Sequence, residues 1–122
     1  KDYRENSAII TGSSERLRQV FLNLLLNARD AMPHGGKLTI SLCAKDGFAE
    51  ISFMDTGTGI SESDLPNIFE PFYTTKKDSG TGLGLAVCYG IIRSHHGFIT
   101  AGNNPEGGAV FTIKLPLKVD NE

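Results

Sequence analysis

Asp55-Thr56-Gly57-Thr58-Gly59 places one carboxylate at the head of a glycine-rich turn, directly after the strand-like run 48–54. A second glycine-rich segment, Gly80-Thr81-Gly82-Leu83-Gly84-Leu85, opens a helix-like stretch. Glycines at this density let the backbone approach a ligand closely. A helix that begins among glycines also presents free N–H groups and a positive dipole end, which suit phosphate. One carboxylate and one phosphate cradle together predict a bound nucleotide.

Segments whose apolar residues have helical spacing alternate with segments whose apolar residues have strand-like spacing around these two glycine-rich segments. A first helix is expected from Ser14, capped by Ser13 and ended by 32–36, and a second over 83–95, ended by Gly97. The residues expected to be buried on the two helices are Leu17, Val20, Phe21, Leu24, Leu25 and Ala28, and Leu85, Val87, Cys88, Ile91 and Ile92. Strands are expected at 8–11, 37–43, 48–54, 98–101 and 109–115, with Asp46-Gly47 as a hairpin turn, one helical turn at 61–65 and a long loop over 66–82. This order predicts a two-layer α/β sandwich, in which two or three helices cover a mixed, mostly antiparallel sheet of about five strands.

Composition narrows the class of protein. The 122 residues suit a single domain, and a net charge of −2 gives no reason to expect nucleic acid or a membrane surface as partner. No run approaches the roughly 20 apolar residues of a membrane span, and the first residues do not resemble a signal peptide. We therefore expect residues 1–122 to be one cytoplasmic domain, monomeric in isolation, from a longer protein. Cys43 and Cys88 form no CxxC pair and are expected to be free, buried or half-buried thiols.

The two glycine-rich segments do not match three familiar ligand-binding motifs. Residues 80–85 are not a P-loop and do not follow a strand with the dinucleotide-binding spacing. The segment that begins at Asp55 lacks the further acidic positions of a calcium loop.

Four segments in order resemble the N, G1, F and G2 boxes of histidine kinases: Asn23–Ala28, Asp55–Ile60, Phe69–Phe72 and Gly80–Leu85. One box is a weak signal, whereas four in order at suitable spacing are a strong one. The resemblance covers the chain from Ser14 to Leu115 and implies the Bergerat-type fold of the GHKL superfamily, shared with gyrase B subunits, MutL and the ninety-kilodalton heat-shock chaperones. The phrases 69–76 and 80–85 look closest to NtrB-like sensor kinases of two-component systems.

The resemblance implies a set of site residues for ATP, for its product ADP and for Mg²⁺. Asp55 matches the residue that accepts a hydrogen bond from the adenine amino group, and the alternative is an ordinary turn aspartate. The implied nucleotide-binding residues are Asn23, Asn27, Asp30, Asp55, Gly57, Gly59, Ile60, Phe72, Thr75, Lys76, Gly80, Thr81, Gly82, Leu83, Gly84 and Leu85.

Asn27 matches the magnesium-binding asparagine of the family, and Asn23, one helical turn earlier, is a second candidate ligand. The alternative for both is an asparagine on the helix surface. In hydrolysing relatives the position of Asn23 holds a glutamate that activates water, and an asparagine cannot act as that base. The resemblance therefore implies phosphoryl transfer rather than hydrolysis.

The long loop resembles the lid of the family. Lys76 and, more weakly, Lys77 are candidates to reach the triphosphate, and the alternative is solvated loop charge. Phe69, Phe72 and Tyr73 are expected either to anchor the lid or to dock a neighbouring helix, and Phe69 is equally well explained as a core residue.

One departure follows the N box, where Asp30 and Ala31 come after Arg29 and the basic residue and tyrosine often found there are absent. The phosphate contact usually made at that place then comes from Arg29, from Lys76 or from nothing. Asp30 is a candidate to reach the edge of the base through water.

The three histidines do not fit the phosphoacceptor pattern of a histidine followed by an acidic residue on a long helix. His34 precedes two glycines in a turn, and His95 and His96 are expected at a helix C-terminus, in a structural role. The resemblance therefore implies a catalytic ATP-binding domain without its phosphoacceptor histidine or base. Its expected partners are the helical dimerisation and phosphoacceptor domain of the same kinase and, through the full kinase, a response regulator receiver domain.

The expected function is to bind Mg·ATP and to donate the γ-phosphoryl to a histidine on that separate domain, with little turnover by the isolated chain. Two alternatives stay open. One is another enzyme of the same fold, an ATPase or a serine-phosphorylating anti-sigma kinase. The other is a catalytically idle module that docks a partner.

Overall fold

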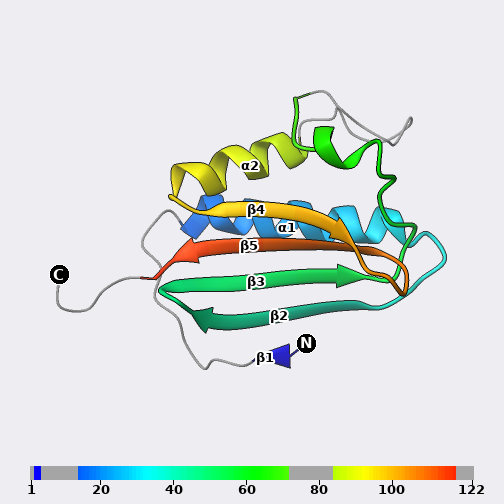
Figure 1. The fold of residues 1–122 in the computed structure, drawn as a ribbon, viewed down its shortest axis with the longest axis horizontal. Coiled ribbons are helices and arrows are strands. Elements are labelled where there is room, and N and C mark those ends of the chain that lie inside the picture. Colours follow the sequence, from blue (N-terminus) through cyan, green and yellow to red (C-terminus); the bar gives the residue numbers. More distant parts are fainter. Residues whose placement is uncertain (1, 4–13, 72–83, 118–122) are drawn as a thin grey trace.

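The computed structural model describes residues 2–3, 14–71 and 84–117. The elements are β1 (Asp2–Tyr3), α1 (Ser14–Ala31), β2 (Leu38–Lys45), β3 (Phe48–Asp55), the short 3-10 helix η1 (Leu65–Asn67), α2 (Gly84–Ser94), β4 (Phe98–Asn103) and β5 (Ala109–Pro116). The strands form one sheet in the order β1-β2-β3-β5-β4 (Figure 1). The β1–β2 pair is parallel and the other neighbours are antiparallel.

One face of the sheet and the two long helices enclose the core. Every second residue of β3 and β5 is buried, and the register places Phe53 opposite Phe111 and Ile51 opposite Ile113. The helices add Val20, Leu24, Cys88, Ile91 and Ile92 to this cluster. The alternation has the period of a strand whose two faces meet different surroundings. The predicted two-layer α/β sandwich with its mixed, mostly antiparallel sheet is confirmed.

The predicted buried stripes were wrong at two positions. The side chains of Leu25 and Val87 are each 37% exposed. On α1 the face toward the sheet runs through Val20, Leu24 and Ala28, and a residue one step further along a helix points about 100° away. Leu25 and Val87 stand one step beside fully buried neighbours and therefore turn outward.

The chain reversals follow the turn chemistry of the sequence. Asp46 and Gly47 both have positive φ, at 55° and 82°, as a two-residue hairpin between twisted strands requires, so the predicted turn is confirmed. At the end of α2 the left-handed residue is His96, with φ of 63°, and Gly97 N–H donates to the Ile92 carbonyl at 2.9 Å. Gly97 is required for a different reason, because a Cβ there would lie 2.3 Å from the Lys114 carbonyl oxygen.

The strand expected near the N-terminus and the strand found there involve different residues. The strand expected at 8–11 lies outside the described residues, whereas β1 at Asp2–Tyr3 was not expected from the sequence. The end of α1, the end of β3 with the loop that follows it, the start of α2 and the start of β5 contribute residues to one cavity. In Figure 1, α1 and β3 both end on the right of the view, where β5 begins. The candidate site is this cavity.

Candidate functional site

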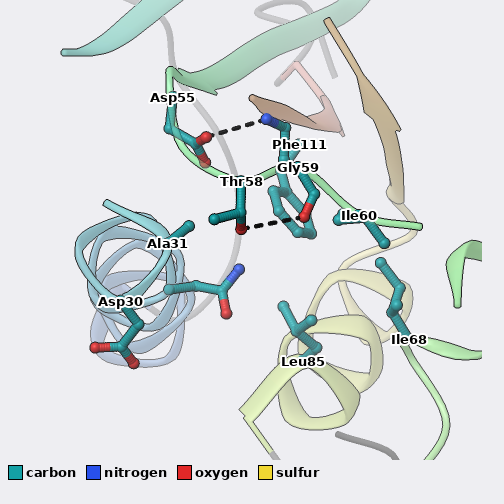
Figure 2. Close-up of a pocket in the computed structure, with 11 residues that line it drawn as sticks. Asp30, Ala31, Asp55, Thr58, Gly59, Ile60, Ile68, Leu85 and Phe111 are labelled. Atoms are coloured by element: carbon teal, nitrogen blue, oxygen red, sulfur yellow. Dashed lines mark hydrogen bonds between the residues drawn. The ribbon is translucent and has the colours of Figure 1, made fainter. Parts of the chain in front are cut away.

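Asp55 ends β3 with a carboxylate that is only 4% exposed. Its Oδ1 accepts hydrogen bonds from the Gly57 N–H at 2.9 Å and from the Ala109 N–H at 3.0 Å. These two charge-assisted bonds offset much of the cost of burying the carboxylate. No described residue donates to Oδ2, which faces the cavity beside it (Figure 2). Within the described part of the chain, the site therefore presents one fixed acceptor atom that has no donor.

A cavity of about 180 Å³ opens below this carboxylate. Its lining comes from the end of α1, the end of β3 and the loop after β3, the residue that follows η1, the start of α2, and β5. The residues are Asn27, Asp30, Ala31, Asp55, Thr58, Gly59, Ile60, Ile68, Leu85, Ala109 and Phe111 (Figure 2). Its lining combines apolar side chains with the polar residues Asn27, Asp55 and Thr58. Such a lining suits a flat, largely apolar ring that offers one hydrogen-bond donor to Asp55.

The glycines next to Asp55 serve two different purposes. At Gly57 a Cβ would lie 2.3 Å from the Ala31 carbonyl oxygen, so the absence of a side chain lets the turn pack on the end of α1. Gly59 has φ of 77° and lines the cavity itself. Gly57 thus leaves space for the adjoining chain, and Gly59 remains a candidate for contact with the base.

Asn27 and Asp30 both line the cavity, as expected for residues of the candidate site. The Asp30 carboxylate pairs with Arg29 at 3.5 Å, and in Figure 2 it points away from Asp55. The Arg29 side chain is 73% exposed.

Asn23 takes a different position from Asn27. Its Nδ2 donates to the Gly84 carbonyl at 3.4 Å, which ties α1 to the first residue of α2, and it does not line the cavity. The same side chain hydrogen-bonds Cys88, which is buried between the helices and also lies 3.8 Å from the Val20 carbonyl oxygen. The structure thus brings Asn27 to the cavity and Asn23 to the helix start, and a metal-binding role for either stays a prediction.

Burial raises the pKa of the Cys88 thiol from 9.0 to about 11, although the bond with Asn23 acts in the opposite direction. The unfolded chain releases this proton near pH 9, whereas the folded domain keeps it until about pH 11. We therefore expect the contribution of this group to folding stability to be constant below pH 9 and to fall by about 3 kcal/mol as the pH rises from 9 through 11. Urea unfolding across this range checks it, with Cys88→Ala as the comparison, because other groups titrate equally in both proteins. Parallel pH profiles in the two would contradict the prediction.

Several predicted residues lie outside the described part of the chain. These are Phe72, Tyr73, Thr75, Lys76, Lys77, Gly80, Thr81, Gly82 and Leu83, and their roles stay predictions. Phe69 is described, and its ring lies 5.7 Å from that of Tyr89 and 6.5 Å from that of Phe111, centroid to centroid. It packs against the core, so the core interpretation of Phe69 is confirmed.

Sequence reasoning missed five lining residues: Ala31, Thr58, Ile68, Ala109 and Phe111. The alternation of 109–115 already places Ala109 and Phe111 on the inward face of their strand, and pairing of this strand with β3 would have brought them to Asp55. Ile68 follows η1 in a segment without hydrophobic periodicity, and no pattern signals it.

The histidine and cysteine side chains that are described lie away from the cavity lining. His95 is 9% exposed and its Nδ1 lies 2.8 Å from the Ile91 carbonyl oxygen, in keeping with a structural role. Cys43 and Cys88 are free thiols, as predicted. Neither long helix within the described ranges has the length and apolar character needed to cross a bilayer.

The sequence matches a known family over most of its length. Residues 12–119 match the family described as Histidine kinase-, DNA gyrase B-, and HSP90-like ATPase. Sporulation kinase C of Bacillus subtilis (strain 168) is 40% identical over 122 residues, which cover 99% of this chain and 28% of the relative. The signal transduction histidine-protein kinase BaeS of Escherichia coli (strain K12) is 38% identical over 120 residues, 94% of this chain and 26% of the relative. The chain thus spans little more than a quarter of the length of these relatives.

Solved structures agree with the sequence matches. The nucleotide-free catalytic domain of histidine kinase ThkA is similar with a TM-score of 0.85 and 34% identity, over 94% of this chain and 75% of that chain. Full-length ShkA in complex with AMPPNP gives a TM-score of 0.83 at 30% identity, over 96% and 25%. ThkA in complex with the response regulator protein TrrA gives 0.80 at 30%, over 95% and 33%. The chain belongs to the histidine kinase-, gyrase B- and HSP90-like ATPase family, as an ATP-binding catalytic domain of the histidine kinases of two-component signalling.

Proposed function

We propose that this domain binds Mg·ATP with the adenine in the cavity beside Asp55 and donates the γ-phosphoryl to a histidine on a separate helical domain. The observation that carries the proposal is the Asp55 carboxylate, which is buried, held through Oδ1 by two backbone N–H groups and left with Oδ2 facing the cavity. An amino group on the ligand completes the hydrogen bonding of that oxygen. Adenine has such a group, whereas guanine presents a carbonyl at the same place, so the acceptor favours adenine.

The start of α2 is the proposed phosphate side of the site. Leu85 lines the cavity, and Gly84, the first residue of the helix, has no described atom within 4 Å of where a Cβ would stand. Packing among the described residues therefore does not explain this glycine, whereas close approach of a phosphate to the helix start does. In this proposal Lys76 and Gly80–Leu83 add the remaining phosphate contacts.

The donor set at the cavity fits a magnesium ion that also keeps waters and phosphate oxygens. The Asn27 amide oxygen is a hard ligand of the kind that Mg²⁺ takes, and it reaches the cavity from α1. Asn23 would act from one turn earlier, through its own amide oxygen, while its nitrogen holds the Gly84 carbonyl. The ion supplies neutralisation of phosphate charge when it is bound.

In the proposed transfer, an imidazole nitrogen of the acceptor histidine forms a bond to the γ-phosphorus. The bond from that phosphorus to the bridging oxygen breaks, ADP leaves, and the imidazole proton passes to a base outside this domain. Asn23 stands where hydrolysing relatives hold a glutamate and cannot activate water as a base. The similar kinases ShkA, in complex with AMPPNP, and ThkA, in complex with the response regulator TrrA, support ATP as the ligand and a response regulator as the partner of the full kinase. We propose a cytoplasmic site of action and a monomeric isolated domain.

We expect the isolated chain to bind ADP and ATP and to hydrolyse almost none. Radiolabelled ATP incubated with residues 1–122 and Mg²⁺ should release phosphate at the buffer rate. Addition of the helical phosphoacceptor domain from the same kinase should produce acid-labile, base-stable phosphohistidine on that domain. A rapid magnesium-dependent ATPase of the isolated chain would contradict transfer and favour the hydrolase alternative. Absence of any nucleotide binding would favour the idle docking module.

A further inference from the structure

Asn103, the last residue of β4, uses both ends of its side-chain amide on a single residue of the cavity wall. The Ile60 N–H donates to Asn103 Oδ1 at 2.7 Å, and Asn103 Nδ2 donates to the Ile60 carbonyl. The two residues are 43 positions apart in the sequence. A side chain thus pairs with the main chain of Ile60 as a neighbouring strand would.

The Gly59–Ile60 segment, the Ile60 wall, lines two hollows. Gly59 and Ile60 line the cavity below Asp55 (Figure 2). The same two residues, with Thr58, also line a shallow depression that contains Asn103 and residues of the β4–β5 loop. Asn103 lines this depression and not the cavity, so its contact with the wall is made outside the cavity.

Hydrogen bonds to other parts of the described chain hold the segment from Asp55 to Ile60 in place. Asp55 Oδ1 accepts from the Ala109 N–H, Thr56 Oγ1 accepts from the Lys37 N–H at 3.0 Å, and the Thr58 N–H donates to the Ala31 carbonyl at 3.2 Å. These bonds fix the segment as far as Thr58. At Ile60, the bonds with Asn103 make the polar attachment.

The close fit at Gly59 points to the same contact. A Cβ at Gly59 would lie 2.9 Å from Asn103 Oδ1, and the residue has φ of 77°. Gly59 therefore lets the main chain come close enough for the amide of Asn103 to reach both polar groups of Ile60. Any substitution that lengthens or removes this amide changes the position of the wall.

We infer that Asn103 is a positioning residue for base recognition, which sets the distance between the Ile60 wall and Asp55 without touching the nucleotide. This inference rests on the proposed nucleotide site and names a residue that the sequence motifs of that site do not include. The energetic reason is that a wall fixed before binding spares the ligand the cost of ordering it.

The chain offers a matched control in the next residue. Asn104 is the first residue of the β4–β5 loop, and its Nδ2 contacts Met54 Sδ while its Oδ1 accepts from the Glu106 N–H at 3.1 Å. It does not hydrogen-bond the segment from Asp55 to Ile60. Asn104→Ala therefore perturbs the β4–β5 loop and leaves the wall attachment in place.

The test measures ADP binding by calorimetry and backbone amide hydrogen exchange by NMR in the wild type, Asn103→Ala, Asn103→Asp and Asn104→Ala. We expect Asn103→Ala to lose about tenfold in ADP affinity, equal to about 1.4 kcal/mol, and to exchange the Ile60 amide faster while the Gly57 amide stays protected. Asn103→Asp keeps the acceptor for the Ile60 N–H and loses the donor, so its loss should be intermediate. Asn104→Ala should keep wild-type affinity and Ile60 protection.

Magnesium tripolyphosphate separates a base effect from a general loss of folding. It carries the phosphates without a base, so its affinity should be equal in the wild type and Asn103→Ala. Wild-type ADP affinity in Asn103→Ala, or an equal loss in Asn104→Ala, would overturn the inference. Failure of the wild-type protein to bind ADP would instead overturn the proposed function, together with the role of Asn103 in it.

Discussion

Replacing Asp55 with asparagine is expected to reduce ADP affinity by about 100-fold, while the domain stays folded. The two N–H groups of Gly57 and Ala109 converge on the same atom, Oδ1, so they require an acceptor there. The substituted amide must then turn its oxygen toward the backbone and its NH₂ toward the cavity. An NH₂ group facing the adenine amine replaces a charge-assisted bond by two opposed donors, and a lost bond to a charged group alone costs about 1.5–3 kcal/mol.

The same orientation predicts a change in base preference. Hypoxanthine presents a carbonyl oxygen where adenine presents its amine, and the NH₂ of Asp55→Asn can donate to that oxygen. IDP should therefore lose much less affinity than ADP, so that discrimination between the two bases nearly disappears. Calorimetric titration of both nucleotides into both proteins measures this ratio.

Glu50→Gln is the matched control for this experiment. Glu50 lies on the same strand as Asp55, and its side chain alternates onto the face of the sheet away from the core. The substitution also removes one negative charge from β3, so any general effect of charge on nucleotide binding appears in both variants. Equal ADP affinities in the wild type and Asp55→Asn would remove the carboxylate from base recognition and with it the main support for the proposed site.

The parts of the site that the sequence predicted are those encoded by neighbours along the chain. Asp55 follows an alternating strand, Asp46-Gly47 has the turn chemistry of a tight hairpin, and Asn27 lies on a periodic helix. Each of these depends on contacts within a few residues, where propensity and hydrophobic period are informative. They placed the acceptor and the asparagine at the correct ends of their elements.

The parts that could not be predicted depend on strand pairing across long separations. β5 lies between β3 and β4, so the last strand in the sequence is not at the sheet edge. This insertion brings the Ala109 N–H to Asp55, 54 positions away, and places Asn103 beside Ile60. Hydrophobic alternation indicates which face of a strand is buried, but it does not indicate which strand lies next to it.

Gly108→Ala is expected to cost about 2–6 kcal/mol of folding stability and to abolish measurable ADP binding. The residue has φ of 93°, which an alanine adopts only with strain of about 1–3 kcal/mol. In addition, a Cβ would lie 1.9 Å from the Asp55 carbonyl oxygen and 2.9 Å from the Thr56 Cα. Both atoms are backbone, so no side chain can rotate out of the way, and such overpacking adds about 1–3 kcal/mol. The main chain at Asp55 must move, and the bond from the adjacent Ala109 N–H to Oδ1 moves with it.

Gly107→Ala separates these two contributions. Gly107 also has positive φ, at 114°, but among the described residues outside its chain neighbours no atom lies within 4 Å of where its Cβ would stand. Its substitution should therefore cost only the conformational strain, about 1–3 kcal/mol, and leave ADP affinity unchanged. The difference between the two variants in urea unfolding and in calorimetry then isolates the contact between the β4–β5 loop and Asp55. If both alanines cost the same and both proteins bind ADP normally, that contact is not what holds the carboxylate in place, and the end of β3 alone must do so.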